Sequence, residues 1–100
     1  MANVSFLARM TVKEGREKEF IRLARELEKQ VHANEPGTLY YRFFRLRGPR
    51  EFAVMESFAD EAAEELHMNT KWLQEIAPSL LDCMEGGDPP YVREFLDPME

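Results

Sequence analysis

Residues 38–58 read TLYYRFFRLRGPREFAVMESF and form two apolar runs on either side of a short turn. The turn is Arg47-Gly48-Pro49-Arg50, where glycine and proline favour chain reversal. Runs rich in aromatic and large apolar residues are typical of strands, so we predict a β-hairpin with strands over 38–46 and 51–58. Because apolar side chains fill both alternating positions of the first strand, we expect it to be covered on both faces.

The sequence before the hairpin predicts one strand and one helix. Residues 4–12 alternate apolar and other side chains with the period of a strand. Residues 16–33 instead have apolar side chains at helical spacing, with charged residues mostly between them: Phe20, Leu23, Ala24, Leu27 and Val31. The stretch Asn34-Glu35-Pro36-Gly37 ends this amphipathic helix, because proline cannot donate into the helix ladder.

The sequence after the hairpin predicts a second helical region and a last strand. Asp60 stands at an N-cap position, where its carboxylate can accept from unpaired helix amides. We expect Asn69-Thr70 and Pro78 to break the region into consecutive helical pieces. Gly86-Gly87-Asp88-Pro89-Pro90 ends it, and residues 91–96 are apolar enough for a short strand.

The order strand, helix, strand, strand, helix, strand is the split βαβ pattern of the α+β, ferredoxin-like fold. We predict a single domain over residues 1–100 with one antiparallel sheet and both helices on one face. Yet the second strand carries apolar side chains on both faces, with Leu39, Tyr41 and Phe43 on one and Tyr40, Phe44 and Leu46 on the other. Since large exposed apolar patches usually mark a partner surface, we infer a homodimer packed sheet against sheet.

Composition excludes several classes of protein. The 100 residues are 44% hydrophobic and carry a formal charge of −6, the wrong sign for a surface that follows nucleic-acid phosphates. Cys83 is the only cysteine, so this chain alone can build neither an internal disulfide nor a cysteine-based zinc cage. With no signal-peptide pattern at the start and no apolar run long enough for a membrane span, we expect a soluble cytoplasmic protein without a membrane partner.

Two blocks of sequence carry a resemblance to a known family. Residues 35–41, EPGTLYY, and residues 52–70, FAVMESFADEAAEELHMNT, resemble the antibiotic biosynthesis monooxygenase domain family. The resemblance implies a dimeric α+β barrel and a group of functions. Members include cofactor-independent oxygenases of quinols and polyketides, heme-degrading proteins, isomerases of small phosphorylated sugars, and proteins with no known activity.

The resemblance separates these functions only in part. Its heme-degrading branch uses an asparagine on the first strand with a tryptophan and a histidine, and Ala8 stands at the corresponding position here, so that triad is incomplete. The phosphosugar function requires cations near the pocket, for which Arg42 and Arg45 are candidates.

His67 and Glu56 are the candidate catalytic residues. An imidazole exchanges protons near neutral pH, and the resemblance places His67 on a helix that lines a cavity. The alternative is a partly exposed histidine or one with a structural hydrogen bond. Glu56 should share a strand face with Phe52, Val54 and Phe58, and an acid among apolar neighbours is either paired or shifted in pKa. It could orient His67 by a hydrogen bond or form an ion pair with an arginine on a neighbouring strand.

Four further residues are candidates for substrate binding. Trp72 lies among apolar residues of the second helical region and could be a core anchor, a substrate-stacking residue, or both. Tyr40 and Tyr41 point to opposite faces, so only one can reach a cavity under the helices, and the sequence leaves open which. Asn69 lies next to the end of the block that carries the resemblance and is the fourth candidate.

These residues predict a cofactor-independent monooxygenase of a small electron-rich aromatic, quinol-like or polyketide-like substrate. Such an enzyme needs a dry pocket, a base to take a phenolic proton, and donors that hold the resulting anion. The sequence has no glycine-rich dinucleotide motif and no clustered set of metal ligands, which agrees with a site without cofactor or metal. Two alternatives stay open: a non-catalytic module that binds a small ligand, and an isomerase of a small phosphorylated metabolite.

Overall fold

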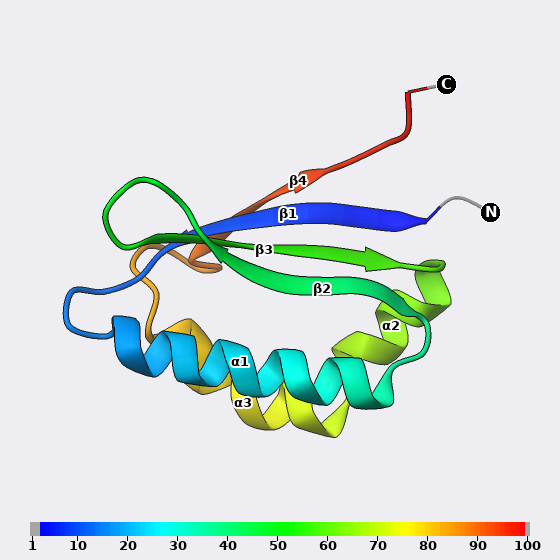
Figure 1. Cartoon of the computed structure of the whole chain (residues 1–100), viewed down its shortest axis with the longest axis horizontal. Helices are drawn as coiled ribbons and strands as arrows, with labels where there is room; N and C mark the ends of the chain where they lie inside the picture. Colours follow the sequence, from blue (N-terminus) through cyan, green and yellow to red (C-terminus); the bar gives the residue numbers. More distant parts are fainter. Residues whose placement is uncertain (1–2, 100) are drawn as a thin grey trace.

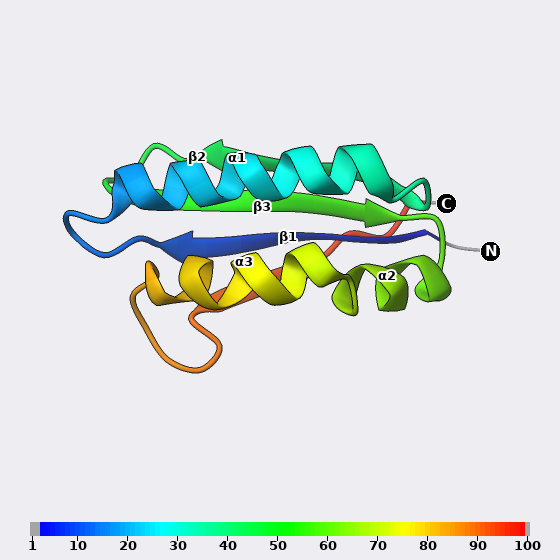
Figure 2. The same ribbon diagram turned by 90° about the horizontal axis from the view of Figure 1, so that it is seen from below.

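The computed structural model describes residues 3–99 and has an α+β architecture. Its elements are β1 (Val4–Thr11), α1 (Glu17–Asn34), β2 (Thr38–Arg45), β3 (Glu51–Phe58), α2 (Glu61–Met68), α3 (Lys71–Asp82) and β4 (Tyr91–Phe95). The four strands form one antiparallel sheet in the order β2-β3-β1-β4. All three helices lie on the same face of this sheet, as Figures 1 and 2 show. The predicted ferredoxin-like fold is confirmed.

The helical region after the hairpin divides in two, as the sequence predicts. Asp60 caps α2, and its side chain accepts a hydrogen bond of 2.8 Å from the Ala63 amide. Thr70 caps α3 by accepting from the Leu73 amide. Because each cap satisfies an amide that lacks a partner in the first helical turn, the chain restarts as a new helix after Asn69.

Pro78 does not interrupt the helix, and the prediction of a break there is wrong. It lies inside α3, which continues to Asp82. A proline removes one hydrogen bond, to the carbonyl four residues earlier. The helix continues because packing of its apolar side against the core stabilises it. Leu80 is buried, and Leu73, Ile76 and Ala77 are partly buried on that side.

The start of β2 contains an irregularity that the alternating pattern does not predict. Thr38 pairs with Phe58 and Tyr40 with Ser57, so Leu39 is an extra residue in the register. Its side chain is 55% exposed, and the prediction that it shares the covered face with Tyr41 and Phe43 is wrong. The extra residue still leaves Tyr41 directed into the core and Tyr40 away from it.

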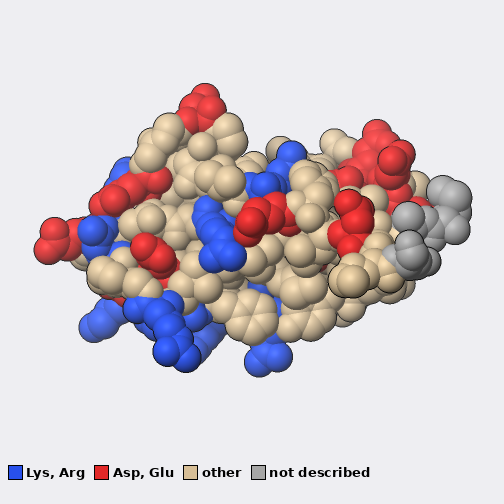
Figure 3. All heavy atoms as spheres, turned by 90° about the horizontal axis from the view of Figure 1, so that it is seen from above, with Lys and Arg blue, Asp and Glu red and all other residues tan. Residues whose placement is uncertain are grey.

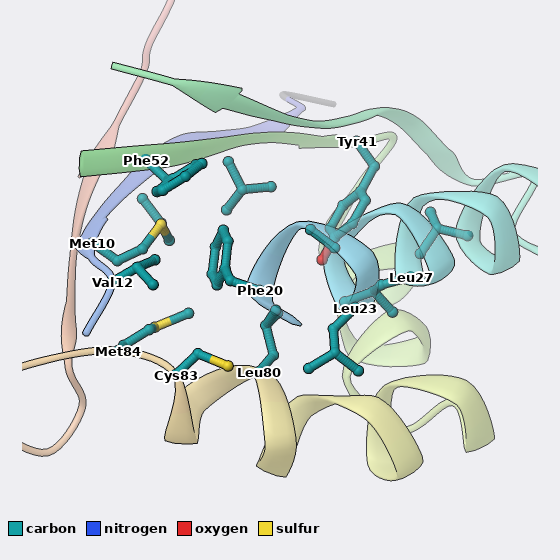
Figure 4. Packing of buried hydrophobic residues seen from close by; sticks show 14 of the residues in the cluster. Met10, Val12, Phe20, Leu23, Leu27, Tyr41, Phe52, Leu80, Cys83 and Met84 are labelled. Atoms are coloured by element: carbon teal, nitrogen blue, oxygen red, sulfur yellow. The ribbon is translucent and has the colours of Figure 1, made fainter. Parts of the chain in front are cut away.

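The hydrophobic core fills the space between the sheet and the helices (Figure 4). Phe20 of α1 is completely buried, and its ring lies 4.8 Å from the Phe52 ring of β3. Cys83 is also fully buried beside this cluster. The core thus joins α1 and α3 to the middle of the sheet.

The opposite face of the sheet carries no helix. Register places Leu7, Ala53 and Met55 on this side, with the exposed side chains of Tyr40 and Phe44 beside them. Figure 3 views the molecule from this side and shows uncharged atoms interrupted near the middle by acidic and basic groups, with further basic groups along one margin. The Arg9–Glu94 ion pair lies on this side. We refer to this as the open face. Within residues 3–99, no helix is both long and apolar enough to cross a membrane.

Candidate functional site

A cavity of about 180 Å³ lies between the sheet and the helices. Its walls are mostly apolar and come from every strand and from all three helices. The apolar and aromatic wall residues include Phe6, Ala8, Tyr41, Val54 and Leu80. Its charged or titratable groups other than tyrosine are Glu56, His67 and Arg93. Such a chamber suits a small, largely apolar molecule with one or two polar groups.

His67 is buried at the end of α2 and presents one edge to the cavity. Only 2% of its surface is exposed, which rules out the partly exposed alternative. Its ring lies between the Tyr41 and Phe58 rings, with both centroids 5.2 Å away. Nδ1 is 2.8 Å from Glu35 Oε1, and Nε2 is 3.8 Å from Glu56 Oε1. The ring therefore has a carboxyl group on each side.

Glu35, between α1 and β2, is the residue that sequence reasoning missed. Its side chain is almost fully buried and its two oxygens meet three polar groups. Oε1 accepts a 2.7 Å hydrogen bond from Thr38 Oγ1 and lies against His67 Nδ1, while Oε2 accepts a 2.6 Å bond from Trp72 Nε1. The signal that could have found Glu35 is its place in Glu35-Pro36-Gly37, part of a block that carries the family resemblance.

Glu56 lies in a different environment from Glu35. Burial raises the pKa of its carboxyl group to about 8; the charge of Arg93 acts in the opposite direction, and Glu64 and Glu35 add smaller increases. At 3.8 Å, the distance from Oε1 to His67 Nε2 is too long for the hydrogen bond that could have oriented the ring. The orienting carboxyl group is Glu35 instead, because only its geometry is that of a hydrogen bond.

Of the two adjacent tyrosines, the structure brings Tyr41 to the cavity. Its ring is buried among Phe43 and His67, and burial, followed by the charge of Glu56, raises the pKa of its phenol well above the usual value. Tyr41 therefore keeps its proton and can act as a donor. Tyr40 points to the open face, where 38% of its surface is exposed.

Trp72 and Asn69 lie outside the cavity wall. Trp72 is partly buried against the core and uses its indole N–H to bind Glu35, so it reaches the site only through that carboxyl group. Asn69 is the C-cap of α2, and its side-chain amide donates to the Glu65 carbonyl. Both residues thus lie next to the site without lining it.

The cations proposed for a phosphate lie elsewhere. Arg42 and Arg45 border a separate hollow between α1 and β2. Arg45 also pairs with Glu17 at 2.9 Å. Arg93 is the cationic side chain at the cavity, and its guanidinium lies 5.2 Å from the Phe6 and Phe95 ring centroids. Within residues 3–99, no cluster of three His, Cys, Asp or Glu side chains is placed to hold a metal ion.

The arrangement is suited to proton transfer. An imidazole nitrogen and a carboxyl oxygen face a mostly apolar chamber side by side, and both can exchange a proton with a bound hydroxyl group. Tyr41 and Arg93 can donate hydrogen bonds to an oxygen that gains negative charge.

Comparisons with known proteins agree with this architecture. A solved structure from Caulobacter crescentus, provisionally described as an antibiotic biosynthesis monooxygenase, is 27% identical with a TM-score of 0.89, covering 99% of this chain and 92% of that one. The protein PA3566 from Pseudomonas aeruginosa is 21% identical with a TM-score of 0.84, covering 100% and 97%. A conserved protein from Methanosarcina mazei is 22% identical with a TM-score of 0.84, covering 97% and 93%. The latter two are similar in fold.

A search of curated proteins gave no match. The family model for antibiotic biosynthesis monooxygenase matches residues 4–79, which include Glu35, Glu56 and His67 but end before β4 and Arg93. The chain belongs to the antibiotic biosynthesis monooxygenase family.

Proposed function

We propose that this protein is a cofactor-independent monooxygenase whose substrate is a small electron-rich aromatic alcohol such as a quinol. The observation that carries the proposal is the placement of His67: its Nδ1 is bound to Glu35, while its Nε2 faces an apolar cavity. A base that faces a mostly apolar chamber can take the proton of a phenol and leave an electron-rich anion. That anion then passes an electron to dioxygen, which is the step such a substrate provides by itself.

The other groups at the cavity fit the same chemistry. Tyr41 retains its proton and can donate a hydrogen bond to the phenolate, and Arg93 adds positive charge at the same chamber. The pKa of Glu56 is raised to about 8, so its neutral form predominates at pH 7 and its repulsion of a bound anion is reduced. We propose catalytic roles for His67 and Glu56 and a substrate-binding role for Tyr41.

The size of the chamber narrows the class of substrate. A cavity of roughly 150 Å³ lined by apolar residues is known to hold benzene. The chamber here is about 180 Å³, so one substituted ring fits and a fused three-ring polyketide does not. This favours a quinol over a polyketide. A phosphorylated sugar is less well suited, because Arg93 shares the chamber with two acid–base groups and mostly apolar walls.

We further propose that the protein acts as a homodimer joined through the open face. Phe44 is 40% exposed there and Val92 is 67% exposed, and the partly exposed side chains of Leu7 and Met55, which pair with each other, lie on the same face. A second copy would remove these apolar groups from water.

Oxygen uptake with a panel of single-ring quinols tests the proposed function. Replacing His67→Ala should lower quinol-dependent uptake by at least about 100-fold, because loss of a general base commonly costs that much. His32→Ala is the histidine comparison and should cost much less, since His32 does not line the cavity and binds only the main-chain carbonyl of Tyr41. Unchanged uptake in His67→Ala would remove the residue from the mechanism. Saturable quinol binding with no oxygen consumed by the wild-type protein would show a binding module instead.

A further inference from the structure

We propose that Glu35 is the positioning residue of this site, and that the turn Glu35-Pro36-Gly37 sets its distance from His67 by packing against α2. Glu35 does not line the cavity, so its effect on a substrate passes through the imidazole. The inference rests on the proposed function in one respect: it takes His67 Nε2 as the atom that receives the phenolic proton of the substrate. The position of the ring itself can be measured without any substrate.

The hydrogen bonds of Glu35 define which nitrogen of His67 carries a proton. Both oxygens of Glu35 already accept hydrogen bonds, Oε1 from Thr38 Oγ1 and Oε2 from Trp72 Nε1. The third contact joins His67 Nδ1 to Oε1 at 2.8 Å, and we infer that Nδ1 donates it, in line with the acceptor role of both oxygens in the other two bonds. A neutral imidazole then has its lone pair on Nε2, on the side of Glu56 and the cavity. Glu35 thus selects the tautomer that can act as a base toward the cavity.

The turn that carries Glu35 is fixed directly against the helix that carries His67. A methyl group added at Gly37 would lie 2.9 Å from Ala63 Cβ, closer than two carbon atoms can pack. The Gly37 carbonyl also accepts a 2.9 Å hydrogen bond from the Ala59 amide, just before α2. Ala63 and His67 are four residues apart on α2 and so lie on one side of it. The absence of a side chain at Gly37 therefore allows the separation of Glu35 and His67 that a hydrogen bond requires.

Gly37 is needed for this close approach and not for an unusual backbone. Its φ angle lies outside the left-handed region, unlike those of Gly15 and Gly86. An alanine at this position meets only the Ala63 methyl group as a close obstacle. The single variant Gly37→Ala should therefore increase the distance between the turn and α2. The double variant that adds Ala63→Gly should restore this distance.

Nitrogen-15 NMR of the His67 ring tests the inference directly, without substrate. In the wild-type protein we expect the neutral ring to carry its hydrogen on Nδ1, in a signal protected from exchange with water. In Glu35→Gln we expect a population with the hydrogen on Nε2, because the glutamine amide can donate to Nδ1. A wild-type ring with hydrogen on Nε2, or a Glu35→Gln spectrum identical to wild type, overturns the proposal.

Activity separates a positioning role from a merely structural one. Glu35→Gln should lower quinol-dependent oxygen uptake about 10-fold or more, and adding it to His67→Ala should cause no further loss, since Glu35 acts through that ring. Gly37→Ala should also lose uptake and the Nδ1 signal, and Ala63→Gly should restore both. Additive losses, or no restoration, would show that Glu35 serves only the fold. If the wild-type protein takes up no oxygen, the proposed function fails while the NMR result still decides the inference.

Discussion

The two faces of the sheet use the same strands for different purposes. On the covered face, Tyr41 and Glu56 border a chamber under the helices, whereas on the open face Tyr40 and Phe44 remain in contact with solvent. Neighbouring residues of one strand are thereby assigned to a chemical site or to a contact surface by the direction of the side chain alone. The two tyrosines show the difference: burial raises the pKa of Tyr41, whereas Tyr40, a residue of the same type, is exposed.

The largest effect should come from the burial of Glu56 on the covered face, and it should appear in the pH dependence of the free energy of unfolding. Folding raises the pKa of Glu56 from 4.5 to about 8, so the folded state favours its neutral form. The stability from this group is present below pH 4.5 and is lost as the pH rises through about 8. Glu56→Gln keeps a neutral side chain and should be more stable than wild type by a few kcal/mol near pH 9, with little difference near pH 4.

Urea unfolding of both proteins across this pH range checks the expectation. Arg93, Glu35, Glu64 and His67 face or influence the same group and remain in both proteins, so their contributions largely cancel in the comparison. Curves that run parallel from acid to alkaline pH would show that the covered face does not hold Glu56 neutral.

A charge placed on the open face should divide the proposed dimer. Phe44→Glu would place a carboxylate between the two sheets in place of an apolar ring, with Arg42 able to offset only part of the cost, and should weaken association by about 10-fold or more. Sedimentation of the wild-type protein should give the mass of two chains and that of Phe44→Glu the mass of one.

Leu66→Glu is the control for this experiment, because Leu66 is even more exposed than Phe44 but lies on α2, on the helical side of the molecule. It should leave the mass at two chains. A wild-type protein that sediments as one chain, or a Phe44→Glu protein that still pairs, would contradict the role assigned to the open face.

The smallest expected effect concerns the two tyrosine hydroxyl groups. Tyr41→Phe removes a donor at the cavity and should lower quinol-dependent oxygen uptake about five-fold, the equivalent of one ordinary hydrogen bond. Tyr40→Phe changes the open face and should leave uptake within the error of the assay. Equal losses in both variants would mean that the two faces are not functionally separate.

Much of the fold could be predicted because its signals are local. The α1 helix follows from helical spacing, the β2–β3 hairpin from two apolar runs and a turn, and the α2 cap from Asp60. The errors arose where tertiary contacts outweigh local preference. Pro78 is held within α3 by packing, and the extra residue at Leu39 changes the pairing register without a sign in the alternation.

For the candidate site, the residues that face the cavity could be predicted from the sequence, but the residue that orients His67 could not. His67 and Glu56 could be chosen from residue chemistry and family resemblance, and the alternation showed that Tyr40 and Tyr41 diverge. Glu35 was marked only by its place in a block that carries the family resemblance, and nothing local gave its role, because it binds a ring 32 residues away in the sequence. Its contact depends on how closely the turn at Gly37 approaches α2, which only the assembled fold defines.

A crystal structure of the protein with hydroquinone bound under anaerobic conditions tests the central claim most directly. We predict one ring inside the chamber between the sheet and the helices, with a hydroxyl oxygen within hydrogen-bonding distance of His67 Nε2. A ring bound only on the open face, or a chamber that stays empty of ligand at saturating hydroquinone, would contradict the account.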